Sequence, residues 1–116
     1  MSLIEKTAAE LLALQAAGRA SAVEVADEFL AAVRGREPKL RSFMTVDEAA
    51  VRAQAAAVDA KRKAGGPLGK LAGVPVAVKD VLCTKGMRTT CSSKILDGFV
   101  PPYAAHVVER LRAEDA

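Results

Sequence analysis

The sequence contains few of the residues that bind metals in proteins. It has one histidine, His106, and two cysteines, Cys83 and Cys91. A tetrahedral zinc site needs four ligands at characteristic spacings, so this composition predicts no metal site. Two cysteines also make a poor disulfide framework, and we expect two reduced thiols in a cytosolic protein.

Aromatic residues and long apolar runs are scarce as well. The chain has no tryptophan and one tyrosine, so bases of a nucleic acid would find few rings to stack on. The net charge of +3 is a weak argument for nucleic-acid binding. No apolar run approaches the roughly 20 residues of a membrane helix, and the N-terminus lacks a basic region followed by an apolar one. These absences predict a cytoplasmic protein with no membrane partner.

The composition is otherwise that of a globular protein, with 51% hydrophobic and 27% charged residues in 116 positions. A chain of this length forms one domain that buries roughly two thirds of its unfolded surface. Three positions combine a hydroxyl residue with a glutamate three residues later, which is typical of a helix start. These pairs are Ser2 with Glu5, Ser21 with Glu24, and Thr45 with Glu48. We expect the three helices to end at Gly18, before Gly35 and near Ala64, with Pro38 breaking the chain.

Two segments have the pattern of strands. They are residues 42–46 (SFMTV) and residues 74–78 (VPVAV), where uncharged residues include alternating valines. A polar loop follows residue 79, and we expect a helical turn at residues 93–97 and a last helix from near Ala104. The alternation predicts an α/β fold, but two short strands cannot make a stable sheet. The fold is therefore expected to be incomplete in this chain.

Two basic or glycine-rich segments are candidate phosphate sites. Residues 61–63 (KRK) could form a phosphate-binding patch, but cations in a last helical turn also complement the helix dipole. Residues 65–73 (GGPLGKLAG) match neither GxxxxGK[ST] nor GxGxxG, so we interpret them as a connector.

Lys79 stands at the end of the apolar segment, at the rim of the expected core. It is either a structural cation paired with Asp80 or a neighbour, or a working amine. An ordinary lysine has a pKa near 10.4, and burial against the apolar strand could lower it enough to give a neutral base. Asp80 could orient the lysine or the loop, or it could be a solvated carboxylate. Thr89, Thr90 and Ser92 are interpreted as scaffold hydroxyls, since no histidine or second lysine is placed to activate them.

Residues 71–111 closely resemble the amidase signature family, and within it the glutamine-hydrolysing subunits of tRNA-dependent amidotransferases. The resemblance rests on the strand ending in Val-Lys-Asp, on TKGMRTTCSSKIL and on FVPPY. In that family the lysine at this position belongs to a Ser-cisSer-Lys triad. The resemblance therefore implies that Lys79 is catalytic.

The resemblance also implies a reaction and its partners. A neutral Lys79 would take a proton from a bridging serine, which deprotonates the serine that attacks the side-chain amide of the substrate glutamine. Ammonia would pass to a partner subunit, with subunits B and C completing the amidotransferase. The complex would convert Glu-tRNA(Gln) or Asp-tRNA(Asn), using ATP at the partner and no cofactor bound by this chain.

The sequence departs from the family pattern in two ways. Val81, Ala104 and His106 replace residues common in the family, which affects substrate positioning and leaves the role of the lysine intact. The glycine- and serine-rich segment with both catalytic serines is absent from residues 1–116. We therefore expect the N-terminal part of a single α/β/α amidase domain with a mixed sheet, inactive by itself. Residues 1–70 would be a helical region, and residues 71–116 the strand with the lysine, the polar loop and the following helix.

Two alternatives remain. One is a stand-alone amidase of the same family, which needs no partner subunits and accepts other amides. The other is a non-catalytic module, either a small basic protein that binds RNA or protein or a truncated gene product. TTCSSKIL and FVPPY favour the tRNA-dependent enzyme over both.

Overall fold

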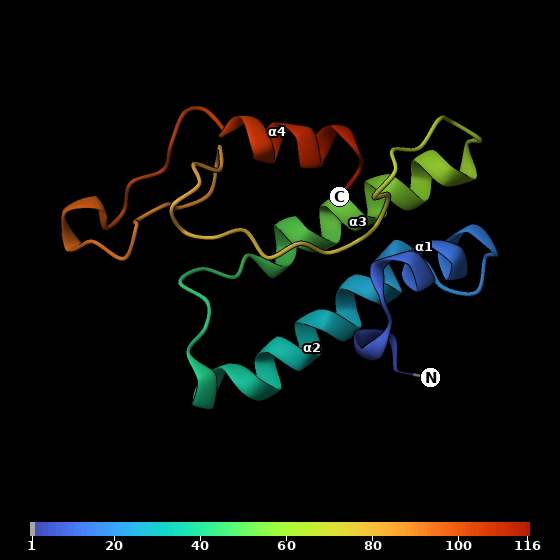
Figure 1. Ribbon diagram of the computed structural model, residues 1–116, viewed down its shortest axis with the longest axis horizontal. Helices are drawn as coiled ribbons and strands as arrows, with labels where there is room; N and C mark the ends of the chain where they lie inside the picture. Colours follow the sequence, from blue (N-terminus) through green and yellow to red (C-terminus); the bar gives the residue numbers. More distant parts are fainter. Residues whose placement is uncertain (1) are drawn as a thin grey trace.

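The computed structural model describes residues 2–116, which form four α-helices and two short 3₁₀-helices (Figure 1). In chain order the elements are η1 (Leu3–Glu5), α1 (Ala8–Ala16), α2 (Ala22–Leu40), α3 (Glu48–Lys63), η2 (Lys94–Leu96) and α4 (His106–Ala113). Helices α2 and α3 pack against each other, and a long irregular segment runs back along α3 before α4 begins. The turn predicted at residues 93–97 and the last helix are confirmed.

The helix starts follow capping chemistry, but only one of the three predicted caps is used. Ser21 and Glu24 form the capping box of α2, as predicted. At the first helix the prediction is wrong, because the Ser2 hydroxyl donates to Glu28 and a second box, Thr7 with Glu10, begins α1. At α3 the cap is Asp47, whose carboxylate accepts a hydrogen bond from the amide of Ala50.

The predicted end of the second helix is also wrong. Helix α2 continues through Gly35 and Pro38 to Leu40, where Arg41 closes it in the left-handed conformation. A proline in the interior of a helix removes one backbone hydrogen bond and clashes with the carbonyl four residues earlier. Pro38 lies in the last turn, where few intrahelical bonds remain to be disturbed, and the helix tolerates it.

The core consists of two small clusters around α2. One cluster joins η1 and α1 to α2 and contains Leu3, Leu11, Leu14, Ala20 and Val25. The second joins α2 to α3 and to the segment after it, and contains Ala22, Ala26, Ala55, Val58 and Ala72. The small alanine side chains allow the helix backbones to approach closely, so α2 serves both clusters with neighbouring faces.

The predicted strands do not form. Within residues 2–116 the structure contains helices only, so the α/β class predicted for this chain is corrected to helical for the part described. Segments 42–46 and 74–78 lie in irregular backbone that belongs to no ladder. A strand needs a neighbour that accepts and donates its main-chain hydrogen bonds, and neither segment has one here.

The segment before Lys79 is instead fixed at its beginning by the C-terminal residues. The amides of Leu71 and Gly73 donate to the carbonyls of Glu114 and Asp115. The Asp115 carboxylate accepts from the Lys61 ammonium at 2.7 Å and from the Gly69 amide at 2.7 Å. The bond from Lys61, followed by that from Gly69, lowers the pKa of Asp115 below its usual value. These contacts bring residues 69–73 alongside α3 and the end of α4.

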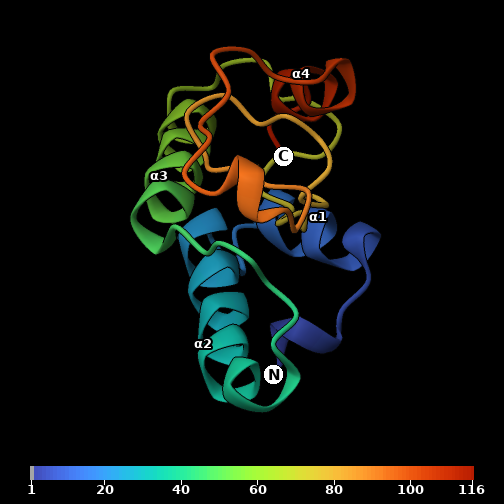
Figure 2. The same cartoon turned by 90° about the vertical axis from the view of Figure 1, so that its left-hand side faces the viewer.

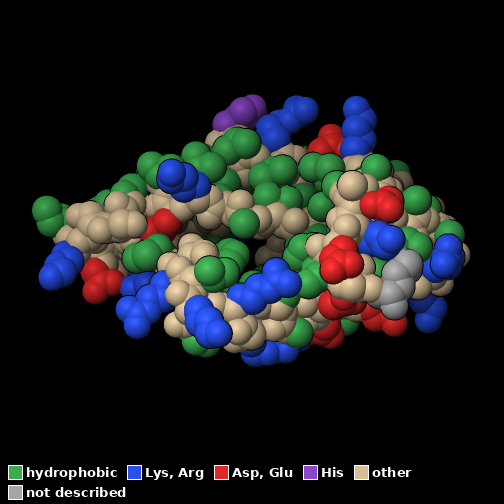
Figure 3. Space-filling model, turned by 60° about the horizontal axis from the view of Figure 1, so that its bottom comes forward, with side chains coloured by type: hydrophobic (Ala, Val, Ile, Leu, Met, Phe, Trp, Pro, Cys, Tyr) green, Lys and Arg blue, Asp and Glu red, His purple; other side chains and the backbone are tan. Residues whose placement is uncertain are grey.

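An apolar groove of about 430 Å³ remains between α2, α3, α4 and residues 73–78. It is lined mainly by hydrophobic side chains, and Val76 and Val78 beside it are 44% and 38% exposed. Hydrophobic side chains surround a hollow on the face shown in Figure 3. Figure 2 shows that the irregular backbone lies in the space between α3 and α4, and that the C-terminal end of α2 extends away from it. The valines predicted to be buried in a strand are therefore only partly covered by this chain.

Candidate functional site

Lys79 lies where the apolar segment meets the polar loop. It is exposed, and it lines a hollow of about 750 Å³. The walls are residues 41–45, residues 77–82 and parts of the loop from Thr84 to Ser92. Within residues 2–116 the apolar segment does not bury Lys79, since no sheet forms around it.

Lys79 does not pair with Asp80, which was one of the two alternatives considered for it. Among residues 2–116 the Lys79 ammonium makes no hydrogen bond and no ion pair, although Asp80 is its neighbour in sequence. Asp80 directs its carboxylate to the returning arm of the loop, where it meets Thr90 and Ser92. The interpretation of Lys79 as a structural cation therefore lacks the ionic partner that it requires.

Asp80 orients the loop, which is one of the two roles considered for it. Its carboxylate accepts hydrogen bonds from the Thr90 hydroxyl, from the Thr90 amide at 2.9 Å and from the Ser92 amide at 3.4 Å. Its backbone carbonyl accepts a fourth bond, from the Cys91 amide at 2.8 Å. The hydroxyl bond, followed by the amide bonds, lowers the pKa of Asp80, and the charge of Arg88 adds to this effect. The carboxylate is therefore ionised at neutral pH.

The loop around Asp80 contains two residues in an unfavourable backbone conformation. Cys91 and Ser92 have φ angles of 51° and 56°, in the left-handed region. This conformation costs a non-glycine residue about 1–2 kcal/mol. Hydrogen bonds to a charged acceptor contribute about 1.5–3 kcal/mol each, so the bonds to Asp80 are strong enough to offset this strain. The loop conformation depends on the carboxylate.

The hydroxyls of Thr89 and Thr90 make hydrogen bonds within the loop, which agrees with their interpretation as scaffold residues. The buried Thr89 hydroxyl donates to the Met87 carbonyl and accepts from the Thr84 amide. The Thr90 hydroxyl donates to the Asp80 carboxylate.

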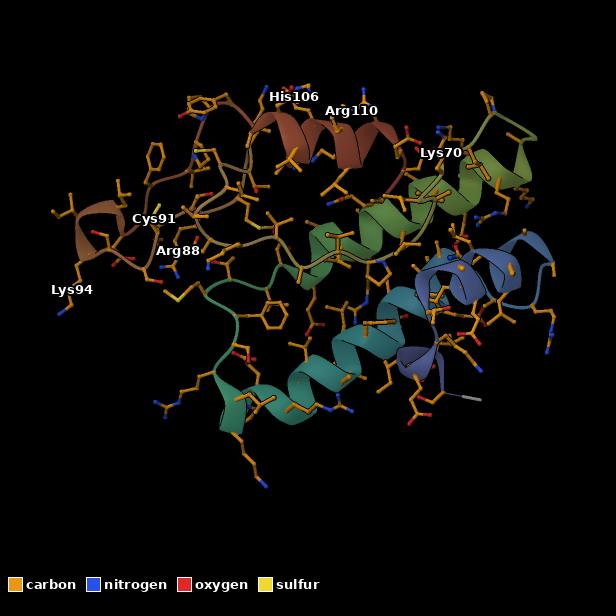
Figure 4. The ribbon with its side chains drawn as sticks, viewed as in Figure 1. Lys70, Arg88, Cys91, Lys94, His106 and Arg110 are labelled. Atoms are coloured by element: carbon orange, nitrogen blue, oxygen red, sulfur yellow. The ribbon has the colours of Figure 1, made fainter. Side chains whose placement is uncertain are left out.

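His106 is exposed and lies on the outer face of α4, as does Arg110, one helical turn further on (Figure 4). In the described part of the chain, no histidine makes a hydrogen bond to the hydroxyls of Thr89 and Thr90.

Arg88 is a site residue that sequence reasoning missed. Its guanidinium donates to the Met44 carbonyl at 3.0 Å and to the Asp97 carboxylate at 2.8 Å. It thereby joins the polar loop to residues 42–46, on the opposite wall of the hollow. Figure 4 shows Arg88 and Cys91 on the same loop, at the end of the molecule away from Lys70. The only signal for this residue in the sequence is that an arginine stands in a loop rich in hydroxyl residues. Its partner, Met44, lies 44 residues away.

Two of the three cations in the basic segment 61–63 make contacts within the chain. Lys61 binds Asp115, and Arg62 donates to Asp59 at 3.4 Å and to the buried Gln15 at 3.4 Å. Two of the three cations thus hold α3 to the rest of the chain.

In residues 2–116 no three His, Cys, Asp or Glu side chains are grouped to hold a metal ion. The helices of this part of the chain are too short or too polar to cross a membrane.

The fold is that of a segment of a known enzyme class. The chain superimposes on a solved structure with a TM-score of 0.90 at 33% identity, over 96% of this chain and 24% of the other. That structure is an inhibitor-bound vestigial protein complex that reveals the evolutionary origins of an s-triazine catabolic enzyme. The same complex without the inhibitor gives the same TM-score of 0.90.

Curated relatives agree over nearly the whole chain. The A subunit of glutamyl-tRNA(Gln) amidotransferase from Rhodopirellula baltica is 54% identical over 95% of this chain, and that of Symbiobacterium thermophilum is 52% identical over 95%. The protein of the same name from Streptomyces coelicolor is 48% identical over 97%. Residues 24–116 match the Amidase family, and the chain belongs to that family. It spans between a fifth and a quarter of these relatives, covering 22% and 23% of their length.

Proposed function

We propose that a longer protein containing this chain is the glutamine-hydrolysing subunit of a tRNA-dependent amidotransferase. The observation that carries the proposal is an identity of 48–54% over at least 95% of the chain to the A subunits of three glutamyl-tRNA(Gln) amidotransferases. Lys79 lies at the rim of a hollow, without an ionic partner among residues 2–116. A carboxylate paired with this lysine would favour its protonated form, which cannot accept a proton.

Lys79 is the proposed catalytic residue of this chain. Its neutral amine would accept a proton from a bridging serine of the family's Ser-cisSer-Lys triad, and that serine would deprotonate the nucleophilic serine. The nucleophile attacks the side-chain amide of glutamine, an acyl-enzyme forms and ammonia leaves. The glycine- and serine-rich segment that carries both serines is not among these 116 residues. We propose that the 116 residues belong to one amidase domain, and that residues 71–116 bring Lys79 to the serines.

The proposed reaction depends on partner subunits. Subunits B and C would complete the complex in the cytoplasm, and charged tRNA would bind through it. ATP would activate the carboxylate of Glu-tRNA(Gln) or Asp-tRNA(Asn) at a partner subunit, where the ammonia from glutamine attacks.

A stand-alone amidase is the second candidate. A solved structure that is 33% identical over this segment is connected with s-triazine catabolism and not with tRNA, although it is a protein complex. The tRNA-dependent relatives are more similar, at 54% identity for the Rhodopirellula baltica protein. We therefore prefer the tRNA-dependent function.

The two candidates differ in their response to a partner. We expect the longer protein to co-purify with a second, ATP-using protein and to release ammonia from glutamine several-fold faster in the complex than alone. The measurement is ammonia release at saturating glutamine, with and without the partner, with a simple aliphatic amide as the control substrate. Full activity of the isolated protein on the aliphatic amide, unchanged by the partner, would favour the stand-alone amidase.

A further inference from the structure

We propose that Asp80 and Thr90 form a positioning pair that holds the Asp80 carboxylate away from Lys79 and so leaves the lysine amine free. This inference rests on the proposed function of Lys79 as a proton acceptor. It concerns a different question, which is what keeps two oppositely charged neighbours in sequence from forming an ion pair.

The loop saturates the carboxylate. One oxygen of Asp80 accepts from the Thr90 amide at 2.9 Å, and the other accepts from the Thr90 hydroxyl and from the Ser92 amide. The Thr90 hydroxyl is itself fixed, because it also accepts from the Ser92 amide at 3.1 Å. The Cys91 amide, between these donors, binds the Asp80 carbonyl. Thr90 is 3% exposed, so its hydroxyl has no competing water shell.

The position of this carboxylate matters because no other described carboxylate lines the hollow with the lysine. The ionisable groups that line the hollow with Lys79 are Arg41, Asp80, Arg88 and the Cys91 thiol. Two of these are cations, which disfavour a protonated lysine, so Asp80 is the group that could stabilise it. A carboxylate within about 4–6 Å would favour the ammonium form of Lys79. The bonds to the loop hold Asp80 out of ion-pair contact with Lys79.

The pair also accounts for a feature that a simple loop turn does not require. Cys91 and Ser92 both adopt left-handed φ angles, which point three successive amides, those of residues 90–92, at Asp80. A solvated carboxylate would need none of these donors. The loop is therefore organised around Asp80, and Lys79 is left on the open side of the segment.

The test uses Thr90→Val and Thr90→Ser in the longer protein, assembled with its partner subunits. Valine removes the hydroxyl donor but keeps the shape, and serine keeps the donor. We expect Thr90→Val to slow the reaction of Lys79 with acetic anhydride at neutral pH several-fold, because a released carboxylate favours the unreactive ammonium form. The value of kcat/KM for glutamine at the same pH should fall by a similar factor. Thr90→Ser should restore both rates to those of the wild type.

A second variant keeps the proposal testable if Thr90→Val fails to assemble. Asp80→Asn removes the charge, so Lys79 labelling should not slow, while hydrogen exchange at the amides of residues 90–92 should become at least ten-fold faster. Three results would each overturn the proposal. They are an unchanged labelling rate in folded Thr90→Val, equal labelling rates for Val and Ser at position 90, and unchanged hydrogen exchange in Asp80→Asn. Lys79 labelling needs no turnover, so failure of this inference is distinguishable from failure of the proposed function, which the activity of Lys79→Arg reports.

Discussion

Lys79→Arg is expected to lower glutamine hydrolysis by the longer protein by a factor of about 10² to 10⁴, the usual contribution of general acid–base catalysis. Arginine keeps the positive charge and much of the length of the side chain, but its guanidinium does not give up a proton at any working pH. Lys79 has no ionic partner among residues 2–116, so the exchange breaks no contact there. The loss should appear in kcat, measured as ammonia release in the assembled enzyme.

Lys94→Arg is the matched control. Lys94 is also exposed, lies at the tip of the loop and points away from the molecule (Figure 4). We expect this variant to keep activity within a factor of about two, since isolated surface charges contribute little. A folded Lys79→Arg protein with activity within a few-fold of the wild type would refute the catalytic assignment.

Gly73→Ala is expected to destabilise the protein by about 3 kcal/mol, through two effects that add. Gly73 has a φ angle of 76°, which costs alanine about 1–2 kcal/mol. A β-carbon there would lie 2.2 Å from the amide oxygen of Gln15 and 2.8 Å from the β-carbon of Ala22. Gln15 is 1% exposed and donates to the Gly73 carbonyl, so it cannot move aside without breaking that bond. Urea unfolding of the longer protein measures the change.

Gly86→Ala separates the two effects. Its φ angle of 81° is nearly the same, but no atom lies within 4 Å of the position that a β-carbon would take. This variant should therefore lose only the conformational part, about 1 kcal/mol. Equal losses for Gly73→Ala and Gly86→Ala would show that the contact between Gly73 and Gln15 does not contribute to the fold.

The parts of the fold that are set by residues close together in the sequence are predictable from the sequence. The capping box at Ser21 and the turn at residues 93–97 are local features, and they are confirmed. The predicted strand at residues 74–78 depends on a partner strand, and no partner forms within residues 2–116. The prediction at Pro38 is wrong because the effect of a proline depends on how many helical bonds remain after it.

In the candidate site, too, the features set by local sequence are predictable and the contacts between distant segments are not. The motif around Lys79 marks this residue in the sequence, and the structure places it at a hollow. Its separation from Asp80 was not predictable, because the loop that captures the carboxylate returns from ten residues later. The contact of Arg88 with Met44 and the burial of Gln15 beside Gly73 join segments 44 and 58 residues apart. No local pattern encodes such contacts.

The proposed function is tested most directly by following the amide nitrogen of glutamine. The purified complex that contains this chain would be incubated with Glu-tRNA(Gln), ATP and glutamine labelled with ¹⁵N at the side-chain amide. The proposal predicts that the label appears in glutamine esterified to the tRNA, and that Lys79→Arg prevents this transfer while free ammonium salts still support it. Release of all the label as free ammonia, with no tRNA-bound glutamine formed from either nitrogen source, would contradict it.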